Sequence, residues 1–291
     1  MAPVQETVSP RSSCPYARVY LEITNVCNLR CSFCHGTCRR GEFMSRERFV
    51  TALDRLAGFT EYVYFHLMGE PLLHPELAEF VTIAANRGFK PCITTNGTLL
   101  PKAGDALIRS GVYKVNISVH SSETDSDIRR AYLDGCLDFA DRASANGVLT
   151  VLRLWNRGVD GGLNDFVLSS LQARFPEPWA RSPHSDGIRL RPKHHLEYGD
   201  RFDWPDMEGE DLGERSFCYG LADHFGVLVD GTVVPCCLDA DGAVNLGNLF
   251  DTPLDSILSS DRAVAIREGF KRKICSEELC RRCGYSRRFK L

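Results

Sequence analysis

The chain has 291 residues, of which 43% are hydrophobic and 25% charged, and its formal net charge at pH 7 is −3. This composition is ordinary for a globular protein, and the balance of charge gives no general attraction to nucleic acid. No hydrophobic run is long enough to cross a bilayer, and residues 1–16 lack the apolar core of a secretory signal. We therefore expect a cytoplasmic protein with one large domain and one small domain, and with no membrane or nucleic-acid partner.

The cysteines are the unusual feature, because there are thirteen of them and most are clustered. Without export, disulfides are not expected, and metal binding is the better use of clustered thiols. A loose arm, 1–16, precedes a strand-like run that leads into Cys27, Cys31 and Cys34. Three thiolates at this spacing can hold three irons of a [4Fe–4S] cube and leave the fourth iron open. Zinc is the alternative, although zinc sites usually show paired Cys-x2-Cys knuckles.

With Phe33 before the last cysteine, this loop resembles the signature of radical S-adenosylmethionine (SAM) enzymes. The resemblance implies that the open iron binds the amino and carboxylate groups of SAM. It also implies that an electron from the cluster breaks SAM to give a 5′-deoxyadenosyl radical, which takes a hydrogen atom from the substrate. An external one-electron donor of the flavodoxin or ferredoxin type is expected on the same basis.

Strand-like and helix-like segments alternate along the first two thirds of the chain. Ser45 is a candidate N-cap for the first helix, Pro75 precedes the second helix, and Gly88 ends it. We expect strands at 19–23, 62–67, 90–94, 113–119, 149–154 and 188–190, and helices at 45–56, 76–86, 102–110, 125–145 and 163–173. Six strand–helix repeats predict an α/β fold with a parallel sheet, and six are too few to close an eight-stranded barrel. We therefore expect a partial (β/α)6 TIM-like barrel over 17–193, which is also the fold that the resemblance implies.

Ligands of such sheets bind at the carboxyl ends of the strands. Met68-Gly69-Glu70-Pro71 follows the second strand and resembles the family's glycine–glutamate–proline motif. The resemblance implies that Gly69, Glu70 and Pro71 hold the SAM amino group. A glycine lets the backbone approach a ligand closely, and Glu70 offers an anionic acceptor to an ammonium group. An ordinary strand-to-helix turn is the alternative.

Weaker candidates follow the next strands. The resemblance implies that Asn96 and Ser118 contact the SAM ribose and that Arg153 contacts its carboxylate. Ser and Asn at a strand end are also common as caps or turn formers. The pair His194-His195 falls in a polar stretch after the sixth expected strand, so we expect both residues in a solvated loop.

The chain changes character after residue 193. An acidic and aromatic stretch, 194–217, predicts a linker or lid between domains, and two β-rich runs around Asp230-Gly231 predict a hairpin. The ligands expected for a second metal centre are Cys218, Cys236, Cys280 and Cys283. We therefore expect 218–291 to form a small domain of a hairpin plus helices that holds an auxiliary cluster. Four thiolates could equally close a zinc site.

The opening of this small domain, in which Cys218 is followed by Gly231-x4-Cys236, resembles the auxiliary-cluster domains called SPASM. The cysteines are too few for two auxiliary clusters, so the shortened twitch form fits better. The layout is similar to that of the 2-deoxy-scyllo-inosamine dehydrogenase type, which oxidises an alcohol on a cyclitol. Cys237 and Cys275 could replace an assigned auxiliary ligand, and Cys38 is a rival to the first three cysteines.

Two [4Fe–4S] clusters and SAM together predict a radical SAM enzyme. If the auxiliary cluster is fully ligated by protein, its natural role is to accept an electron from the substrate radical, which makes the reaction a two-electron oxidation such as alcohol dehydrogenation. A maturase that modifies a peptide is an alternative, although 1–16 is too short for a peptide-binding domain. A non-catalytic zinc or iron–sulfur module and an electron-transfer protein are further alternatives. The substrate, a small molecule or a peptide, cannot be named from these residues.

Overall fold

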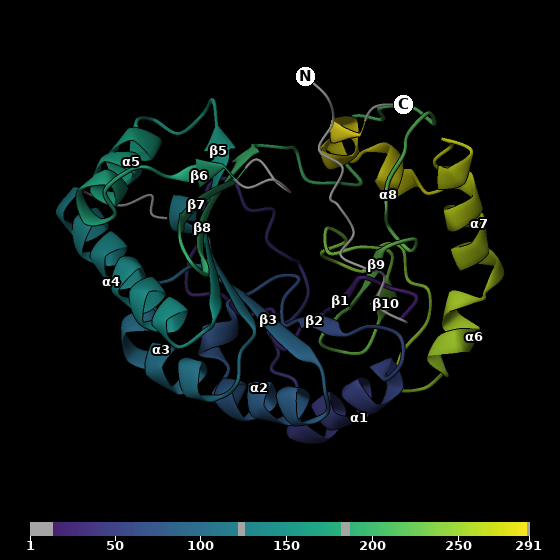
Figure 1. Cartoon of the computed structure of the whole chain (residues 1–291). Helices are drawn as coiled ribbons and strands as arrows, with labels where there is room; N and C mark the ends of the chain where they lie inside the picture. Colours follow the sequence, from purple (N-terminus) through teal and green to yellow (C-terminus); the bar gives the residue numbers. More distant parts are fainter. Residues whose placement is uncertain (1–13, 122–125, 182–186, 290–291) are drawn as a thin grey trace.

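A curved sheet lined on its outside by helices makes up the molecule in the computed structural model, which describes residues 14–121, 126–181 and 187–289 (Figure 1). The described strands form one sheet, in the order β10-β9-β1-β2-β3-β4-β5-β8-β7-β6. The strands are β1 (Arg18–Leu21), β2 (Tyr62–Tyr64), β3 (Lys90–Thr95), β4 (Lys114–Ile117), β5 (Leu149–Arg157), β6 (Ala180–Arg181), β7 (Gly187–Arg191), β8 (His194–Asp200), β9 (His224–Val227) and β10 (Val233–Val234). Most of the expected arm 1–16 lies outside the described residues.

The run β1 to β5 and then β8 is parallel throughout, and a helix follows each of the first five strands. These helices are α1 (Arg46–Leu56), α2 (Leu77–Asn86), α3 (Leu100–Arg109), α4 (Ser126–Ala145) and α5 (Leu163–Arg174). The short elements after them are α6 (Leu254–Leu258), α7 (Asp261–Lys271) and α8 (Glu278–Arg281), and the 3-10 turns are η1 (Pro71–Leu73), η2 (Val119–Ser121) and η3 (Gly284–Arg288). The expected partial α/β barrel is therefore confirmed.

Local sequence signals set the helix ends. Ser45 caps α1, because its side chain accepts from the N–H of Arg48, and Gly88 follows α2 with a φ of +85°. The helices pack on the outer face of the sheet through large apolar side chains. The ring of Phe49 lies 4.1 Å from that of Phe80 and 5.2 Å from that of Phe65.

The sixth parallel strand is not the one expected. Residues 187–191 form β7, but β7 is antiparallel to β8, and it is β8 that pairs in parallel with β5. The first seven residues of the expected linker, 194–217, are therefore a strand. His194 is 0% exposed, so the expectation of a solvated loop was wrong for this residue. The sequence did not indicate a strand at β8 because many of its residues are polar. Polar residues are tolerated there, since one face of the strand lines the barrel interior.

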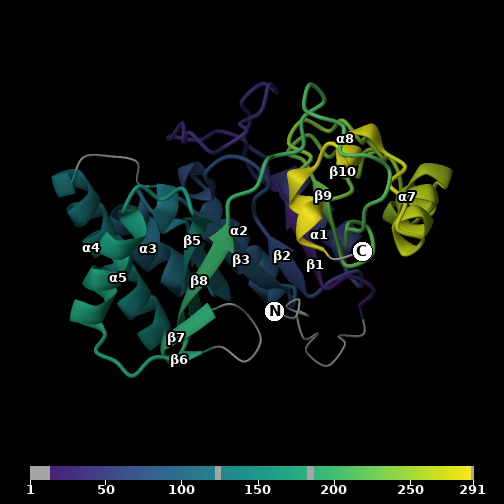
Figure 2. The same ribbon diagram turned by 90° about the horizontal axis from the view of Figure 1, so that it is seen from above.

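The C-terminal hairpin is continuous with the barrel. β9 and β10 pair antiparallel, as predicted, but β9 also pairs in parallel with β1 from Arg18↔His224 to Leu21↔Val227. The two segments lie side by side in both views of the molecule (Figures 1 and 2). The hairpin of the second cysteine-bearing region is thus hydrogen-bonded to β1 as part of the same sheet, in addition to being connected through the chain. None of the helices in the described parts of the chain is both long and apolar enough to span a bilayer.

Candidate functional site

The first cysteine loop starts where β1 ends and has little regular structure. Cys27 and Cys34 are exposed and Cys31 is half-buried, and the N–H of Cys34 donates to the carbonyl of Cys31 over 3.1 Å. Partial burial raises the pKa of the Cys27 thiol, and the nearby charges of Glu70 and Cys34 add to the rise. Three thiols on one exposed loop therefore fit a cluster that keeps one iron accessible.

The loop after β2 packs directly on the start of this cysteine loop. Gly69 has a φ of +78°, and a Cβ at this position would lie 2.5 Å from the carbonyl oxygen of Thr24. The next N–H, that of Glu70, donates to the carbonyl of Val26 over 2.8 Å. Pro71 is buried and begins η1. Only glycine can bring the two backbones this close, so the two sequence motifs form one structural unit.

Glu70 lies deeper than the sequence analysis placed it. Its side chain is 1% exposed, and its carboxylate accepts from the N–H of Leu72 at 3.0 Å, from Thr95 Oγ1 at 2.7 Å and from the N–H of Asn96 at 2.7 Å. Burial raises the pKa of Glu70, although these hydrogen bonds favour the ionised form. The carboxylate thus joins the loop after β2 to the end of β3. Oε1 accepts two of these hydrogen bonds and Oε2 accepts one, so Oε2 can accept another.

Asn96 and Ser118 come together beside the first cysteine. Asn96 Nδ2 donates to Asn28 Oδ1 over 2.9 Å and lies 4.0 Å from Cys27 Sγ. The N–H of Ser118 donates to Thr95, and Tyr132 Oη, which donates to the carbonyl of Asn96, also lies 3.5 Å from the carbonyl of Ser118. The end of β3 therefore meets the cysteine loop through Asn96, and Tyr132 links the end of β4 to it.

Phe33 and Arg153 both contact His120. The ring of Phe33 lies 5.0 Å from that of His120, and its carbonyl accepts from Trp204 Nε1 over 3.1 Å. Trp204 belongs to the segment after β8, so this part of the expected lid touches the cysteine loop. Arg153 Nε lies 3.2 Å from Glu197 Oε2, a neighbouring carboxylate that the sequence analysis did not include.

A buried carboxylate connects the first site to the C-terminal hairpin. Glu22 is 0% exposed, and Arg39 Nη2 lies 2.8 Å from each of its oxygens. The same carboxylate accepts from the N–H of Met68 at 3.1 Å and from the N–H of Val229 at 3.2 Å. Strand β1, the loop after β2 and the hairpin therefore share one anionic centre.

The second group of cysteines surrounds the hairpin and the C-terminal turns. None of the cysteines, all of which lie in the described part of the chain, forms a disulfide. Burial raises the pKa of Cys218 to about 12 and the pKa of Cys236 well above its ordinary value. The charge of Cys283 raises the pKa of both thiols further. Cys280, on α8, is hydrogen-bonded to Cys275. This hydrogen bond and burial raise the pKa of Cys280, and the charge of Cys236 raises it further. The charge of Cys237 also raises the pKa of Cys218 and of Cys236. These mutual effects place six thiols in one neighbourhood, so Cys275 and Cys237 are both rivals to the four expected ligands.

Cys38 and Cys237 also have contacts outside the auxiliary group. Cys38 is exposed, and its N–H donates to Asp241 Oδ1 over 2.9 Å, which fixes it to the turn after the hairpin. Cys237 lies against the hydroxyl of Tyr20 on β1. Among the residues that the structure describes, no three His, Cys, Asp or Glu side chains are already placed around one metal-ion position. The fit to the two clusters therefore rests on the grouping and chemistry of the thiols.

The barrel interior holds residues that the sequence analysis missed. Val63 and Phe65 face the helices, so the alternating Tyr64 and His66 face inward, next to Tyr20. The three rings lie within 5.3 to 5.8 Å of one another. Burial lowers the pKa of His66 to about 3, and its buried Nδ1 has no hydrogen-bond partner in the described part of the chain. The sequence did contain a signal for these residues: along 62–66, polar rings alternate with apolar side chains, which indicates a strand with one polar face.

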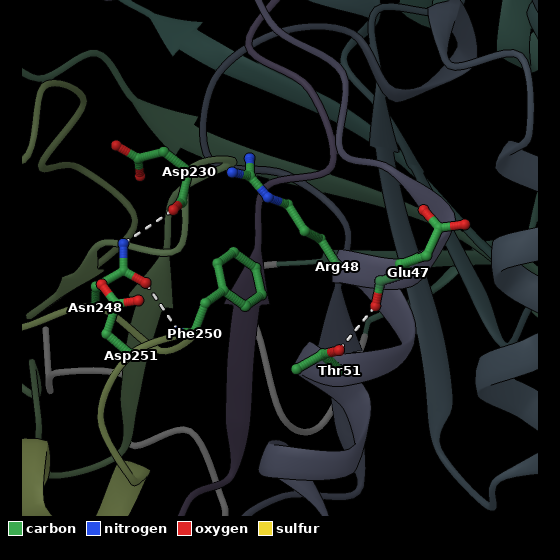
Figure 3. Close-up of a pocket in the computed structure, with 7 residues that line it drawn as sticks. All are labelled: Glu47, Arg48, Thr51, Asp230, Asn248, Phe250 and Asp251. Carbon is green, nitrogen blue, oxygen red and sulfur yellow. Dashed lines mark hydrogen bonds between the residues drawn. The ribbon is translucent and has the colours of Figure 1, made fainter.

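A surface pocket lies apart from both cysteine groups. It is formed between the start of α1 and the hairpin turn (Figure 3). Its lining residues are Glu47, Arg48, Thr51, Asp230, Asn248, Phe250 and Asp251. None of the predicted cofactor-binding residues is among them, so the pocket is not part of the candidate site.

Two family models match the chain. Residues 21–155 match the radical SAM superfamily, and residues 218–284 match SPASM, an iron–sulfur cluster-binding domain. GTP 3′,8-cyclase of Chlorobaculum tepidum is 35% identical over 140 residues, which are 46% of this chain and 42% of that protein. The tungsten-containing aldehyde ferredoxin oxidoreductase cofactor-modifying protein of Pyrococcus furiosus is 42% identical over 87 residues, which are 28% of this chain and 24% of that protein. The chain thus spans less than half the length of these curated relatives.

Solved structures share the fold over most of the chain. BtrN in complex with AdoMet and 2-DOIA has a TM-score of 0.59 at 18% identity, covering 92% of each chain. Native anSMEcpe with bound AdoMet and the Kp18Cys peptide has a TM-score of 0.63 at 14% identity, covering 94% of this chain and 90% of that one. At such identities the likeness concerns the fold alone.

Proposed function

The chain belongs to the radical SAM superfamily and carries a C-terminal SPASM iron–sulfur domain, and we propose that it oxidises an alcohol on a small polar molecule by two electrons. The two domains imply S-adenosylmethionine and two [4Fe–4S] clusters as cofactors. When bound, these groups supply a 5′-deoxyadenosyl radical that removes a hydrogen atom and a second centre that accepts one electron. A flavodoxin- or ferredoxin-type protein would supply the first electron.

We assign the first cluster to Cys27, Cys31 and Cys34, which leave one iron for SAM. Gly69 and Pro71 would hold the loop backbone against the cofactor, and Glu70 would fix that loop and offer the remaining acceptor site of its Oε2 to the SAM ammonium group. The residues that we propose to contact the rest of the cofactor are Phe33, Asn96, Ser118 and Arg153. Their support is positional, because Asn96 reaches Cys27 and Phe33 precedes Cys34 in the same loop.

The grouping of the second set of thiols is the observation that carries the oxidation proposal. We assign the auxiliary cluster to Cys218, Cys236, Cys280 and Cys283, with Cys275 as the alternative ligand. A cluster with four protein ligands has no iron free for substrate, so it serves as an electron acceptor. The domain bounds proposed for this division are 17–200 for the barrel, 201–217 for the connecting segment and 218–291 for the auxiliary domain.

The barrel interior supports a small hydroxylated substrate. After a hydrogen atom leaves the carbinol carbon, the hydroxyl proton and one electron must also leave to form the carbonyl. His66 is neutral there, and its Nδ1, which has no hydrogen-bond partner among the described residues, is our candidate to accept a hydrogen bond from the substrate hydroxyl. Arg153 and Arg18 have carboxylate neighbours, Glu197 and Asp223, and Lys114 on β4 is a third cation buried close to both guanidinium groups. The rings of Tyr20, Tyr64 and His66 lie together in this interior and are the groups that support a hydroxylated substrate.

Deuterium transfer tests the proposal. The anaerobically reconstituted protein, with about eight irons per chain, is incubated with SAM, dithionite and perdeuterated cyclitols or amino alcohols. Deuterium in 5′-deoxyadenosine together with a ketone that has lost two deuterium or hydrogen atoms would support the oxidation. Transfer from a short serine-containing peptide alone would replace the small molecule by a peptide. Zinc without labile sulfide, or no SAM cleavage, would contradict the proposal.

A further inference from the structure

Three cations in the barrel interior are paired with carboxylates, and a fourth is not. Alternate residues of a strand share a face, and Val115 and Ile117 of β4 pack in the core with the helices, so Lys114 faces inward. Its ammonium group has no ion pair and no hydrogen bond in the part of the chain that the structure describes. The inward cations of β1, β3 and β5 each lie within 3.2 Å of a carboxylate oxygen, in the pairs Arg18–Asp223, Lys90–Glu61 and Arg153–Glu197.

The surroundings of the Lys114 ammonium group do not supply the missing counter-charge. Its neighbour on β3 is Cys92, a thiol. Partial burial lowers the pKa of Lys114, and the charges of Arg153 and Arg18 lower it further, while Cys92 and Glu197 offset this only in part. Part of the side chain stays exposed, so a ligand can reach it. An anionic ligand would gain more here than at an exposed lysine, because less water competes for the cation.

Lys114 is the first of three polar side chains along the inner face of β4. Asn116 comes next and is 0% exposed; its Nδ2 donates to Thr94 Oγ1 over 3.1 Å, whereas its Oδ1 has no partner among the described residues. Ser118, which we propose to contact SAM, follows at the next position of the alternation. At about 3.3 Å per residue, Lys114 and Ser118 are about 13 Å apart along the strand. A cation at one end, an unpaired amide oxygen between and the cofactor at the other end suit a short ligand with one charged end.

We propose that the substrate carries one anionic group, a carboxylate or a phosphate, and that Lys114 binds this group inside the barrel. The proposal rests on the function proposed above and names the class of its substrate. The anionic end would lie at the amino end of β4, and the carbon that bears the hydroxyl would lie toward the cysteine loop. Asn116 Oδ1 and His66 Nδ1 would each accept a hydrogen bond from a substrate hydroxyl. A hydroxy acid or a sugar phosphate meets these requirements.

Binding of the anion alone tests this site without knowledge of the whole substrate. The reconstituted protein, loaded with SAM, is dialysed to equilibrium against radioactive inorganic phosphate. We expect saturable binding by the wild-type protein, about tenfold weaker binding by Lys114→Met and near-normal binding by Lys114→Arg. Lys90→Met is the matched control and should bind normally, because Lys90 also faces the interior but is paired with Glu61. Absence of binding, or equal binding by the wild-type protein and Lys114→Met, would overturn the proposal.

A stability measurement separates a binding residue from a structural one. An unpaired cation in a partly desolvated place should destabilise the protein when no anion is bound. We therefore expect Lys114→Met to keep or raise the urea concentration at the midpoint of unfolding in phosphate-free buffer, with unchanged iron content. A clear fall in the midpoint together with loss of iron would give Lys114 a structural role and contradict its assignment to the substrate.

Deuterium transfer connects the anion site to the reaction. Perdeuterated glycerol 3-phosphate and perdeuterated glycerol are compared with SAM and dithionite, and deuterium is measured in 5′-deoxyadenosine. The wild-type protein and Lys90→Met should take about tenfold more deuterium from the phosphate than from glycerol, and Lys114→Met should lose this preference. Transfer from glycerol alone would show that the substrate needs no anionic group. Failure of every protein to cleave SAM would instead contradict the proposed function, whatever the result with phosphate.

Discussion

The two cysteine regions differ in how much of the fold surrounds them. Cys27 and Cys34 are exposed on their loop. The backbone of Gly69 packs closely against Thr24 and Asn25 at the start of this loop and helps to set its shape. The auxiliary thiols are half-buried between a hairpin and short helices, and Cys275 is 3% exposed. An exposed site suits a cofactor that enters and leaves at each turnover, whereas an enclosed site suits a centre that only passes electrons.

The two regions are nevertheless fastened to each other. Glu22 joins Arg39, which follows the first cysteine loop, to Val229 in the hairpin. Asp241, after the hairpin, accepts from the N–H of Cys38. The comparison therefore predicts separate chemistry in the two regions but shared stability.

The largest effect should come from the exposed loop. Cys27→Ala, Cys31→Ala or Cys34→Ala should each abolish SAM cleavage, because three thiolates are the minimum for holding a cube with one open iron. The measurement is 5′-deoxyadenosine formed with dithionite, alongside iron content. Cys38→Ala is the matched control and should retain cleavage. If a variant of the three retained activity, its cysteine would not be a required ligand.

Removing the enclosed site should have a narrower effect. A variant with Cys280→Ala and Cys283→Ala should lose substrate oxidation but still cleave SAM, because radical generation needs only the first cluster. Product formation and 5′-deoxyadenosine are measured on the same samples. Since metal binding can contribute to folding of such a region, circular dichroism serves as the control. Normal oxidation by a folded variant with about four irons would make the auxiliary centre purely structural.

The shared carboxylate tests the link itself. Glu22→Gln should lower the free energy of unfolding by about 3–5 kcal/mol, because it leaves the Arg39 cation without a counter-charge in a buried site. Urea unfolding measures the change. Glu42→Gln is the matched control, since its pair with Arg48 is about half exposed on both sides and should contribute at most about 1 kcal/mol. Equal effects of the two substitutions would mean that the buried pair does not fasten the regions.

The smallest effect is expected at the outer contact. Burial alone would raise the pKa of Asp241, but hydrogen bonds from Thr37 and Cys38 outweigh it and hold the pKa below its ordinary value. The contact thus contributes stability above about pH 4, the pKa of an unfolded Asp, and loses it as pH falls through the lower folded value. Asp241→Asn should cost about 1 kcal/mol and speed hydrogen exchange at the amides of 37–39 at neutral pH. Unchanged exchange would show that Asp241 does not anchor this loop.

Sequence reasoning succeeded where the cause is local. The cap at Ser45 and the stop at Gly88 depend on a few neighbouring residues, and both were predicted. It failed where pairing partners are distant, because nothing near His194 tells which strand will flank it. The interior role proposed for His66 was missed for a related reason. Which face of a strand looks inward depends on the register of the whole sheet.

The site residues were predicted to different depths. The spacing of the first three cysteines was informative by itself, because ligands that share one short loop cannot lie far apart. Glu70 was recognised, but its depth was not, since burial depends on how the end of β3 closes over it. The rivalry of Cys275 with its neighbours also stayed open, because only packing brings Cys275 to Cys280.

The parallel pairing of β1 with β9 has a consequence for how the chain folds during synthesis. The contact between Arg18 and Asp223 closes a loop of 205 positions. At about 5–20 residues per second, tens of seconds pass before the ribosome delivers the strand that completes this edge of β1. Until then β1 has an open edge that can pair with another chain, and the loop with the first three cysteines lacks its fastening to Val229. Assembly of an iron–sulfur centre on that loop should therefore be favoured only after nearly the whole protein has been made.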